Sequence, residues 1–265
     1  MKKYAYIGAL GFLAVITTEF GIIGILPQLA DHYHISIDKA GYLLSAFALI
    51  IAITGPFMTL LASGFDRKKV MLTAIAIFLV TAIVSSLSPP FWLLLIVRIL
   101  PAFLQPVYIA TALSVAILKG GKQNENELMS IVFSGVAIAM EATVPFATYI
   151  ASLSSWTYSF TIQAVVSIFA LLAIYLNIPP LPVKEKKTYG SQMKILTKPI
   201  FLVSTAMNFF MVSAWFSTYS YFAEYLNKAK NMDSTMISYM LFVFGIIGVI
   251  ANWVAGKMLN RNITF

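Results

Sequence analysis

The chain has 265 residues, of which 60% are hydrophobic and 11% charged, and its formal net charge is +8. Soluble domains carry about a quarter charged residues, so this composition excludes a water-soluble globular protein and predicts a chain embedded in a lipid bilayer. The basic residues fall in short runs between apolar stretches, without a basic helix or an RNA-binding aromatic motif, which excludes a nucleic-acid partner. The absence of cysteine excludes disulfides, thiol catalysis and cysteine-based metal sites.

Eight apolar stretches are long enough to cross a bilayer, which takes about 20 residues in a helix. They lack the strict alternation of barrel strands, so the predicted fold class is an all-α membrane protein. The first stretch follows a short basic start, as a signal peptide does, but it is long and has no cleavage site, so we expect it to stay as a span. The predicted spans are residues 4–27, 41–63, 70–88, 91–118, 128–153, 158–178, 201–222 and 235–256.

The distribution of lysine and arginine predicts the orientation. If the N-terminus is cytoplasmic, fourteen of the eighteen Lys and Arg residues fall in cytoplasmic segments, three fall in exterior loops and Arg98 falls in a span. Cytoplasmic loops carry the excess of positive charge. We therefore predict a multi-pass membrane protein with both termini on the cytoplasmic side.

One connecting segment differs from the others. Residues 179–198, PPLPVKEKKTYGSQMKILTK, are rich in proline and lysine and follow the sixth span. Such a segment is typical of a linker between two bundles. We predict a six-helix bundle over residues 1–178, a cytoplasmic linker over 179–198 and an incomplete second bundle of two helices over 199–265.

Three ionisable residues, Glu19, Arg98 and Glu141, fall inside predicted spans. Each is a structural ion pair, a residue that snorkels from near a helix end, or a functional group. Snorkelling is open to the long side chain of Arg98, and the default for charge in a membrane is function. The neighbours of both glutamates at three and four residues along the helix are apolar, so each carboxyl group needs a partner on another helix or a hydrated cavity. A carboxyl group that takes up and releases a proton there is what a proton-coupled carrier requires.

The fourth span also carries a polar face with Arg98 and Gln105. Pro101 and Pro106 remove backbone hydrogen bonds in this span, and Pro145 does the same in the fifth. Broken spans often line binding sites in transporters, although a kinked packing helix is an equal alternative. We list Gln105 and Tyr108 as candidate substrate contacts.

Aromatic residues crowd the last two spans, where Asn208, Trp215 and Tyr219 are further candidate substrate contacts. Membrane-interface belts and lipid-facing rings are the commoner use of such residues. The two histidines, His32 and His34, share one exterior loop and are too few for a metal site. The sequence implies no metal and no cofactor.

Several segments resemble the major facilitator superfamily, and most closely its drug:proton antiporter branch, which includes bacterial arabinose-efflux and purine-efflux permeases. The resemblance runs in order through TTEFGIIGILPQLA (17–30), DKAGYLLSAFALIIAITGP (38–56) and FDRKKVML (65–72). It covers essentially the whole chain. It implies a fold of two six-helix bundles that rock around a central site, in the bacterial cytoplasmic membrane.

The resemblance assigns roles residue by residue. The loop after the second span, TLLASGFDRK (59–68), is similar to the family's cytoplasmic gating loop: Arg67 and Lys68 match it, Ser63 replaces an Asp and Asp66 replaces a Gly. Arg98 matches an arginine implicated in proton relay, and Glu19 matches the T-x-E-F position. The segment GVAIAMEATVPFAT (135–148) keeps Gly135 and Pro145 of the antiporter motif, and Glu141 is an addition to that motif.

The second half begins as the resemblance predicts, with FGIIGVIANWVAGKMLNR (244–261), but four spans of the second bundle do not follow. We expect a truncated product; a fragment, or a chain completed by a partner, is the alternative. The predicted function is proton-coupled efflux of a small solute such as a drug, sugar or nucleobase, with Glu19, Arg98 and Glu141 coupling protons. This is transport and not enzyme catalysis. A homo-oligomer is expected if the short chain works alone, and an inactive remnant is the alternative. A channel or receptor is disfavoured, since the sequence shows no filter-like loop or signalling domain.

Overall fold

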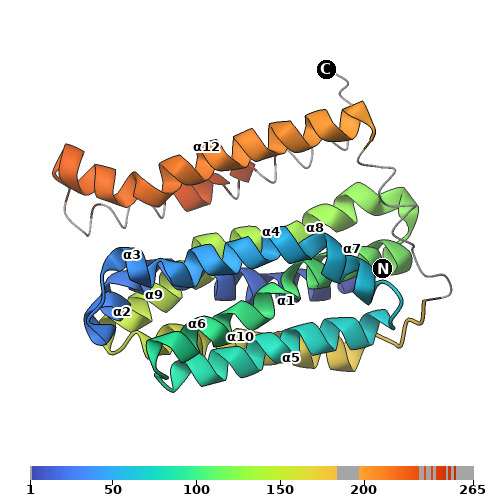
Figure 1. The fold of residues 1–265 in the computed structure, drawn as a ribbon. Helices are drawn as coiled ribbons and strands as arrows, with labels where there is room; N and C mark the ends of the chain where they lie inside the picture. The colour runs from blue at the N-terminus through green and yellow to red at the C-terminus, as the bar shows by residue number, and fades with distance from the viewer. Residues whose placement is uncertain are drawn as a thin grey trace. The chain divides into compact units, whose positions relative to one another are not determined.

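The computed structural model shows an all-helical protein (Figure 1). It describes residues 2–183 and 197–232, together with 236, 240, 243–248, 250, 251 and 254. The helices fall into two compact units, the first containing α1 to α10 and the second containing α12. The division follows α10, within the segment predicted as a linker; the proposed domain bounds stay a prediction.

The first unit contains six membrane-length segments built from shorter helices. In chain order these are α1 (Lys3–Phe20), η1 (Ile23–Ile25), α2 (Leu26–Tyr33), α3 (Ile37–Ala40), α4 (Tyr42–Ala62), α5 (Arg67–Ser86), α6 (Phe91–Ala102), α7 (Gln105–Gly120), η2 (Lys122–Asn124), α8 (Glu125–Ile138), the π-helical turn η3 (Ala139–Thr143), α9 (Val144–Leu153) and α10 (Thr157–Asn177). The second unit contains α12 (Pro199–Lys230).

Within the part of the chain that the structure describes, seven segments are long and apolar enough to cross a membrane. This confirms the first seven predicted spans; half of the eighth, at 235–256, lies outside the described residues. The segments are Lys3–Tyr33, Ile37–Ala62, Arg67–Ser86, Phe91–Gly120, Lys122–Leu153, Thr157–Asn177 and Pro199–Thr218.

Three of these segments are interrupted in their interior. The fourth breaks between α6 and α7, next to Pro101 and Pro106, and the fifth contains the π-helical turn directly before Pro145. Proline removes a backbone donor and its ring clashes with the carbonyl four residues earlier, so both predicted breaks are confirmed. The first segment also breaks, at Gly21, between α1 and η1. The sequence analysis did not predict that break.

The first helix is the most enclosed of the spans. It contacts α5, α7, α8 and α10, and Figure 1 shows it running among them. Small residues permit this close approach, as they do in many membrane helix pairs. A Cβ atom on Gly135 of α8 would collide with the Ala9 carbonyl oxygen of α1, and one on Gly11 would collide with the Tyr108 hydroxyl.

Candidate functional site

A polar layer divides the apolar core of the first unit. One apolar cluster contains Ile16 and Ala102, and a second contains Ile22 and Leu94. Between these levels, α1 carries Glu19 and α6 carries Arg98. Buried polar groups are costly unless they are hydrogen-bonded, so the contacts within this layer define the candidate site.

The Glu19 carboxylate is paired with a neutral amide. Its Oε2 accepts a hydrogen bond of 2.6 Å from Nε2 of Gln105. Glu19 lies next to the last residue of α1, and Gln105 is the first residue of α7, just after the break in the fourth span. The contact therefore joins two helices at the points where both are interrupted.

Arg98 is buried, with 2% of its surface exposed. Its Nη2 donates to the carbonyl oxygen of Thr18 at 3.1 Å and, more distantly, to that of Glu19 at 3.5 Å. The last carbonyls of a helix have no partner within it, and a cation is favoured at that end of the helix dipole. The end of α1 thus supplies the acceptors that hold this guanidinium.

Two aromatic rings enclose the same guanidinium. The Arg98 Cζ atom lies 5.7 Å from the ring centroid of Phe47 on α4 and 5.7 Å from that of Phe160 on α10. Rings at this distance attract a cation through their quadrupole. Among the described residues, no carboxylate lies within ion-pairing distance of Arg98, since the one ion pair there joins Lys2 and Glu127. Glu19 and Arg98 are neighbours without a direct salt bridge.

The break in α1 is held by α10. The Ser159 hydroxyl donates to the Gly21 carbonyl oxygen at 2.8 Å, and Gln163 Nε2 donates to the Ser159 hydroxyl at 3.5 Å. The Gly21 carbonyl needs this donor because the Ile25 amide bonds to Ile22 instead. A Cβ atom on Gly21 would collide with the backbone carbonyl oxygen of Thr17 and would lie 2.9 Å from Gln163 Nε2. Glycine is required there because the backbone oxygen, unlike the glutamine side chain, cannot move aside.

Ser159 and Gln163 were not predicted as site residues from the sequence. The signal that could have revealed them is a stripe of polar residues, four apart, in an otherwise apolar helix: Ser159, Gln163 and Ser167, all of them buried. That spacing places all three on one face. Phe47 was also missed, because nothing in its own segment distinguishes it from other apolar residues.

Replacing Ser159 by Ala is expected to loosen the break in α1. The Gly21 carbonyl would lose its donor, and a buried unsatisfied group costs about 1–3 kcal/mol. Hydrogen–deuterium exchange of a peptide covering residues 19–27 should therefore be faster in the variant. The control is Ser167→Ala, because the equally buried Ser167 hydroxyl only donates to Gln163 within its own helix. Equal exchange in wild type and Ser159→Ala would contradict the role of this bond.

Four buried side-chain atoms in this layer have no hydrogen-bond partner among the described residues. They are Thr17 Oγ1, Arg98 Nε, Gln105 Oε1 and Gln163 Oε1. All four belong to helices that meet at the break in α1. The layer therefore keeps free hydrogen-bonding capacity, which a rearrangement of these helices can use.

Two other predicted residues lie apart from this layer. Glu141 is in the π-helical turn, four residues before Pro145. Proline has no N–H group to donate to the carbonyl four residues earlier. Among the described residues no hydrogen bond joins Glu141 to Glu19 or Arg98. Tyr108 is fully buried and donates to the Gly8 carbonyl at 3.2 Å, packing α7 on α1. The roles predicted for both residues stay predictions.

The predicted substrate contacts of the seventh span belong to the second unit. Asn208 and Trp215 lie on α12, as does the backbone of Tyr219, whose side chain is outside the described residues. Their predicted role stays a prediction.

The predicted gating loop joins α5 to two other helices. Asp66 caps α5 by accepting from the Lys69 amide at 3.0 Å, and Ser63 caps α4 by donating to Leu60 at 2.7 Å. Arg67 Nε donates to Ser114 of α7 at 3.2 Å. Lys68 Nζ donates to the Tyr175 carbonyl at 2.8 Å, near the end of α10. The two basic residues thus tie the start of α5 to α7 and to the end of α10.

Another charged contact joins the N-terminal segment to α8. Lys2 Nζ lies 2.7 Å from Glu127 Oε1, at the start of α8. The pKa of Lys2 is raised because Glu127 accepts its hydrogen bond and carries the opposite charge. Surface pairs of this kind contribute little to stability, so we regard this contact as local.

The prediction that His32 lies in a loop is wrong, because His32 is in α2. Pro27 in the first turn of α2 favours a helix there. Its Nε2 is 3.1 Å from the Ser88 hydroxyl and its ring is 5.2 Å from that of Trp156. His34 follows the helix in a left-handed conformation, with φ of 51°. Among the described residues, no group of three or more metal-ligating side chains is present.

Membrane-length helices that are broken around a buried layer of polar and charged side chains define a class of protein, the multi-pass membrane transporters. The chain belongs to the Major Facilitator Superfamily, whose sequence model matches residues 8–265. This confirms the resemblance seen in the sequence. The family is one of transporters and not of enzymes.

Curated relatives agree with this assignment. The chain is 25% identical to a "Probable sugar efflux transporter" of Helicobacter pylori strain G27, over 93% of this chain and 63% of the relative. It is 25% identical to one of the same name from Pasteurella multocida, over 92% and 60%. It is 26% identical to the "Inner membrane transport protein YdhP" of Escherichia coli K12, over 96% and 66%. The chain thus spans about two thirds or less of the length of these relatives.

Proposed function

We propose that this protein exports a small solute across the cytoplasmic membrane in exchange for protons, with Glu19 as the proton carrier. The observation that carries the proposal is the 2.6 Å hydrogen bond between the Glu19 carboxylate and the Gln105 amide. An amide is neutral, so it does not lock the carboxyl group in one charge state, whereas a direct salt bridge to Arg98 would favour the ionised state.

Gln105 is suited to both protonation states of Glu19. In one orientation its amide nitrogen donates to the ionised carboxylate; in the other, its oxygen accepts from the protonated carboxyl group. The Gln105 oxygen has no other partner among the described residues, so turning the amide breaks no further bond to that atom. Arg98 stays charged at pH 7 and attracts the ionised form of Glu19.

The transport cycle follows from these contacts. Proton uptake by Glu19 removes its attraction to Arg98, and the helix breaks at Gly21 and between α6 and α7 give the bundle points at which to bend. Glu141 is a second proposed proton carrier, and it lies in the π-helical turn that interrupts the fifth span. The proton binds more tightly to one conformation than to the other, and this difference couples proton movement to the conformational change.

The solute class is proposed from the relatives. Two of them are named sugar efflux transporters, so a sugar is the solute to test first. Gln105, Asn208, Trp215 and Tyr219 are the proposed solute contacts, since amides and aromatic rings suit hydroxyl groups and sugar faces. Tyr108 packs α7 against α1 through its hydrogen bond to Gly8, and it would act on the site through that packing.

The function is tested by solute accumulation in everted membrane vesicles that contain this chain. With an imposed proton gradient, labelled arabinose or lactose should accumulate, and a protonophore should abolish the accumulation. Accumulation that resists the protonophore would contradict proton coupling. A correctly inserted chain that accumulates neither sugar would contradict the sugar proposal.

The proposed orientation makes a separate prediction. The chain has no cysteine, so single cysteines can be introduced without background. Asp38→Cys, at an exposed position between the predicted spans 4–27 and 41–63, should react with a membrane-impermeant maleimide in intact cells. Gln123→Cys, at an exposed position between the predicted spans 91–118 and 128–153, should react only after permeabilisation. The reverse pattern would place the N-terminus outside.

A further inference from the structure

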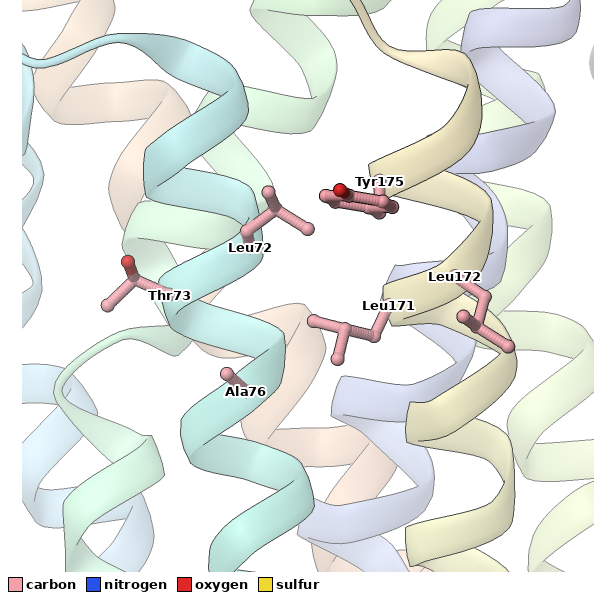
Figure 2. A pocket seen from close by; sticks show the side chains of 6 residues that line it. All are labelled: Leu72, Thr73, Ala76, Leu171, Leu172 and Tyr175. Carbon is pink, nitrogen blue, oxygen red and sulfur yellow. The ribbon is translucent and has the colours of Figure 1, made fainter.

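A groove lies between α5 and α10 in the first unit. Its volume is about 320 Å³, and its walls are Leu72, Thr73, Ala76, Leu171, Leu172 and Tyr175. Figure 2 shows side chains of α5 on one side and those of α10 on the other, with Tyr175 at one end. The small side chain of Ala76 makes room between the leucines. In a membrane-spanning unit, an apolar slot of this kind suits a hydrocarbon chain.

Positive charge lies at one end of the groove. Lys68 and Lys69 precede Leu72 and Thr73 by four residues, which puts them one turn earlier on the same face of α5. The Lys68 ammonium contacts the Tyr175 carbonyl and lies 5.3 Å from the centroid of the Tyr175 ring, which lines the groove. Lys69 is exposed. The two lysines therefore flank the end of the groove that Tyr175 marks.

These lysines retain capacity to bind an anion. A lysine ammonium has three donors, and the Tyr175 carbonyl uses one from Lys68. The positive end of the α5 dipole lies at the same place. Asp66 is the opposing charge there, and its carboxylate caps the Lys69 amide. Lysine beside an aromatic ring at a helix end is also the usual arrangement at a membrane interface.

We propose that this groove binds an anionic phospholipid, with one acyl chain along α5 and α10 and the phosphate on Lys68 and Lys69. The apolar walls select the hydrocarbon and the lysines select the charged headgroup. A free phosphate ion would leave the apolar walls unused, and a zwitterionic lipid would gain less from the lysines. The site is separate from the Glu19–Gln105–Arg98 layer and does not depend on the transport proposal.

The test uses the whole chain, purified in a neutral detergent and stripped of lipid. Native mass spectrometry then measures the binding of phosphatidylglycerol and, in parallel, of phosphatidylcholine. We expect tighter binding of phosphatidylglycerol. Lys69→Gln should weaken it about five-fold, as the loss of about 1 kcal/mol per basic residue near a charged headgroup implies. Ala76→Leu, which fills the groove, should weaken both lipids.

Two matched variants serve as controls. Lys119→Gln removes an exposed lysine near the end of α7, and Ala48→Leu adds the same atoms to an exposed position of α4. Neither residue lines the groove. Neither should alter phosphatidylglycerol binding. Equal affinity for the two lipids would overturn the headgroup assignment. Equal effects of Ala76→Leu and Ala48→Leu would overturn the groove as the site.

Discussion

Proton-driven export should fall to background when Glu19 is replaced by Gln, while exchange of solute across the same membrane continues. Glutamine resembles a protonated glutamate in shape and hydrogen bonding, and its side chain can still pair with the Gln105 amide. It cannot release a proton. In the proposed cycle, net export needs Glu19 to change charge each time, whereas exchange needs only movement of the loaded carrier. Vesicles with a proton gradient and vesicles preloaded with solute measure the two processes.

The matched control is Glu125→Gln, which removes a carboxylate from the first turn of α8, outside the polar layer. It should leave both processes intact. Glu141→Gln tests the second proposed proton carrier in the same assay. Loss of net export and exchange together in Glu19→Gln would indicate a structural role, and retention of both would exclude Glu19 as the proton carrier.

Replacing Gly135 by Ala should strongly destabilise the first unit. The new Cβ atom would collide with the backbone carbonyl oxygen of Ala9, and a backbone atom of a packed helix cannot move aside alone. The α1 and α8 helices would have to separate, at a cost of about 3 kcal/mol for overpacking of this kind. We expect a lower thermal midpoint and a smaller folded fraction in size-exclusion chromatography of detergent-solubilised protein.

Gly8→Ala is the comparison, because Gly8 lies in the same pair of helices. Its Cβ atom would lie 3.3 Å from Val132 Cγ2, a side-chain atom that can shift. Its cost should be clearly smaller than that of Gly135→Ala. If the two variants lose the same stability, the close approach of α1 and α8 at Gly135 is not the reason for glycine there.

The sequence by itself determined the first seven spans and the two proline breaks. Hydropathy is a local property, and the requirement that every backbone group be bonded in lipid leaves a helix as the outcome. Proline acts on its own helix, so the interruptions near Pro101, Pro106 and Pro145 were predictable. Glu19 and Arg98 were recognised because charge inside an apolar run is informative without knowing its neighbours.

Only the tertiary structure decided the partners. Glu19 pairs with Gln105 across 86 residues of sequence and Gly21 with Ser159 across 138, and no local pattern encodes such pairs. The break at Gly21 needs a donor from another helix, so α1 alone did not predict it. Phe47 and Phe160 enclose Arg98 because close helix packing brings α4 and α10 to it. The spacing of apolar residues indicates which face of a helix is apolar, but tertiary packing decides which helix lies against that face.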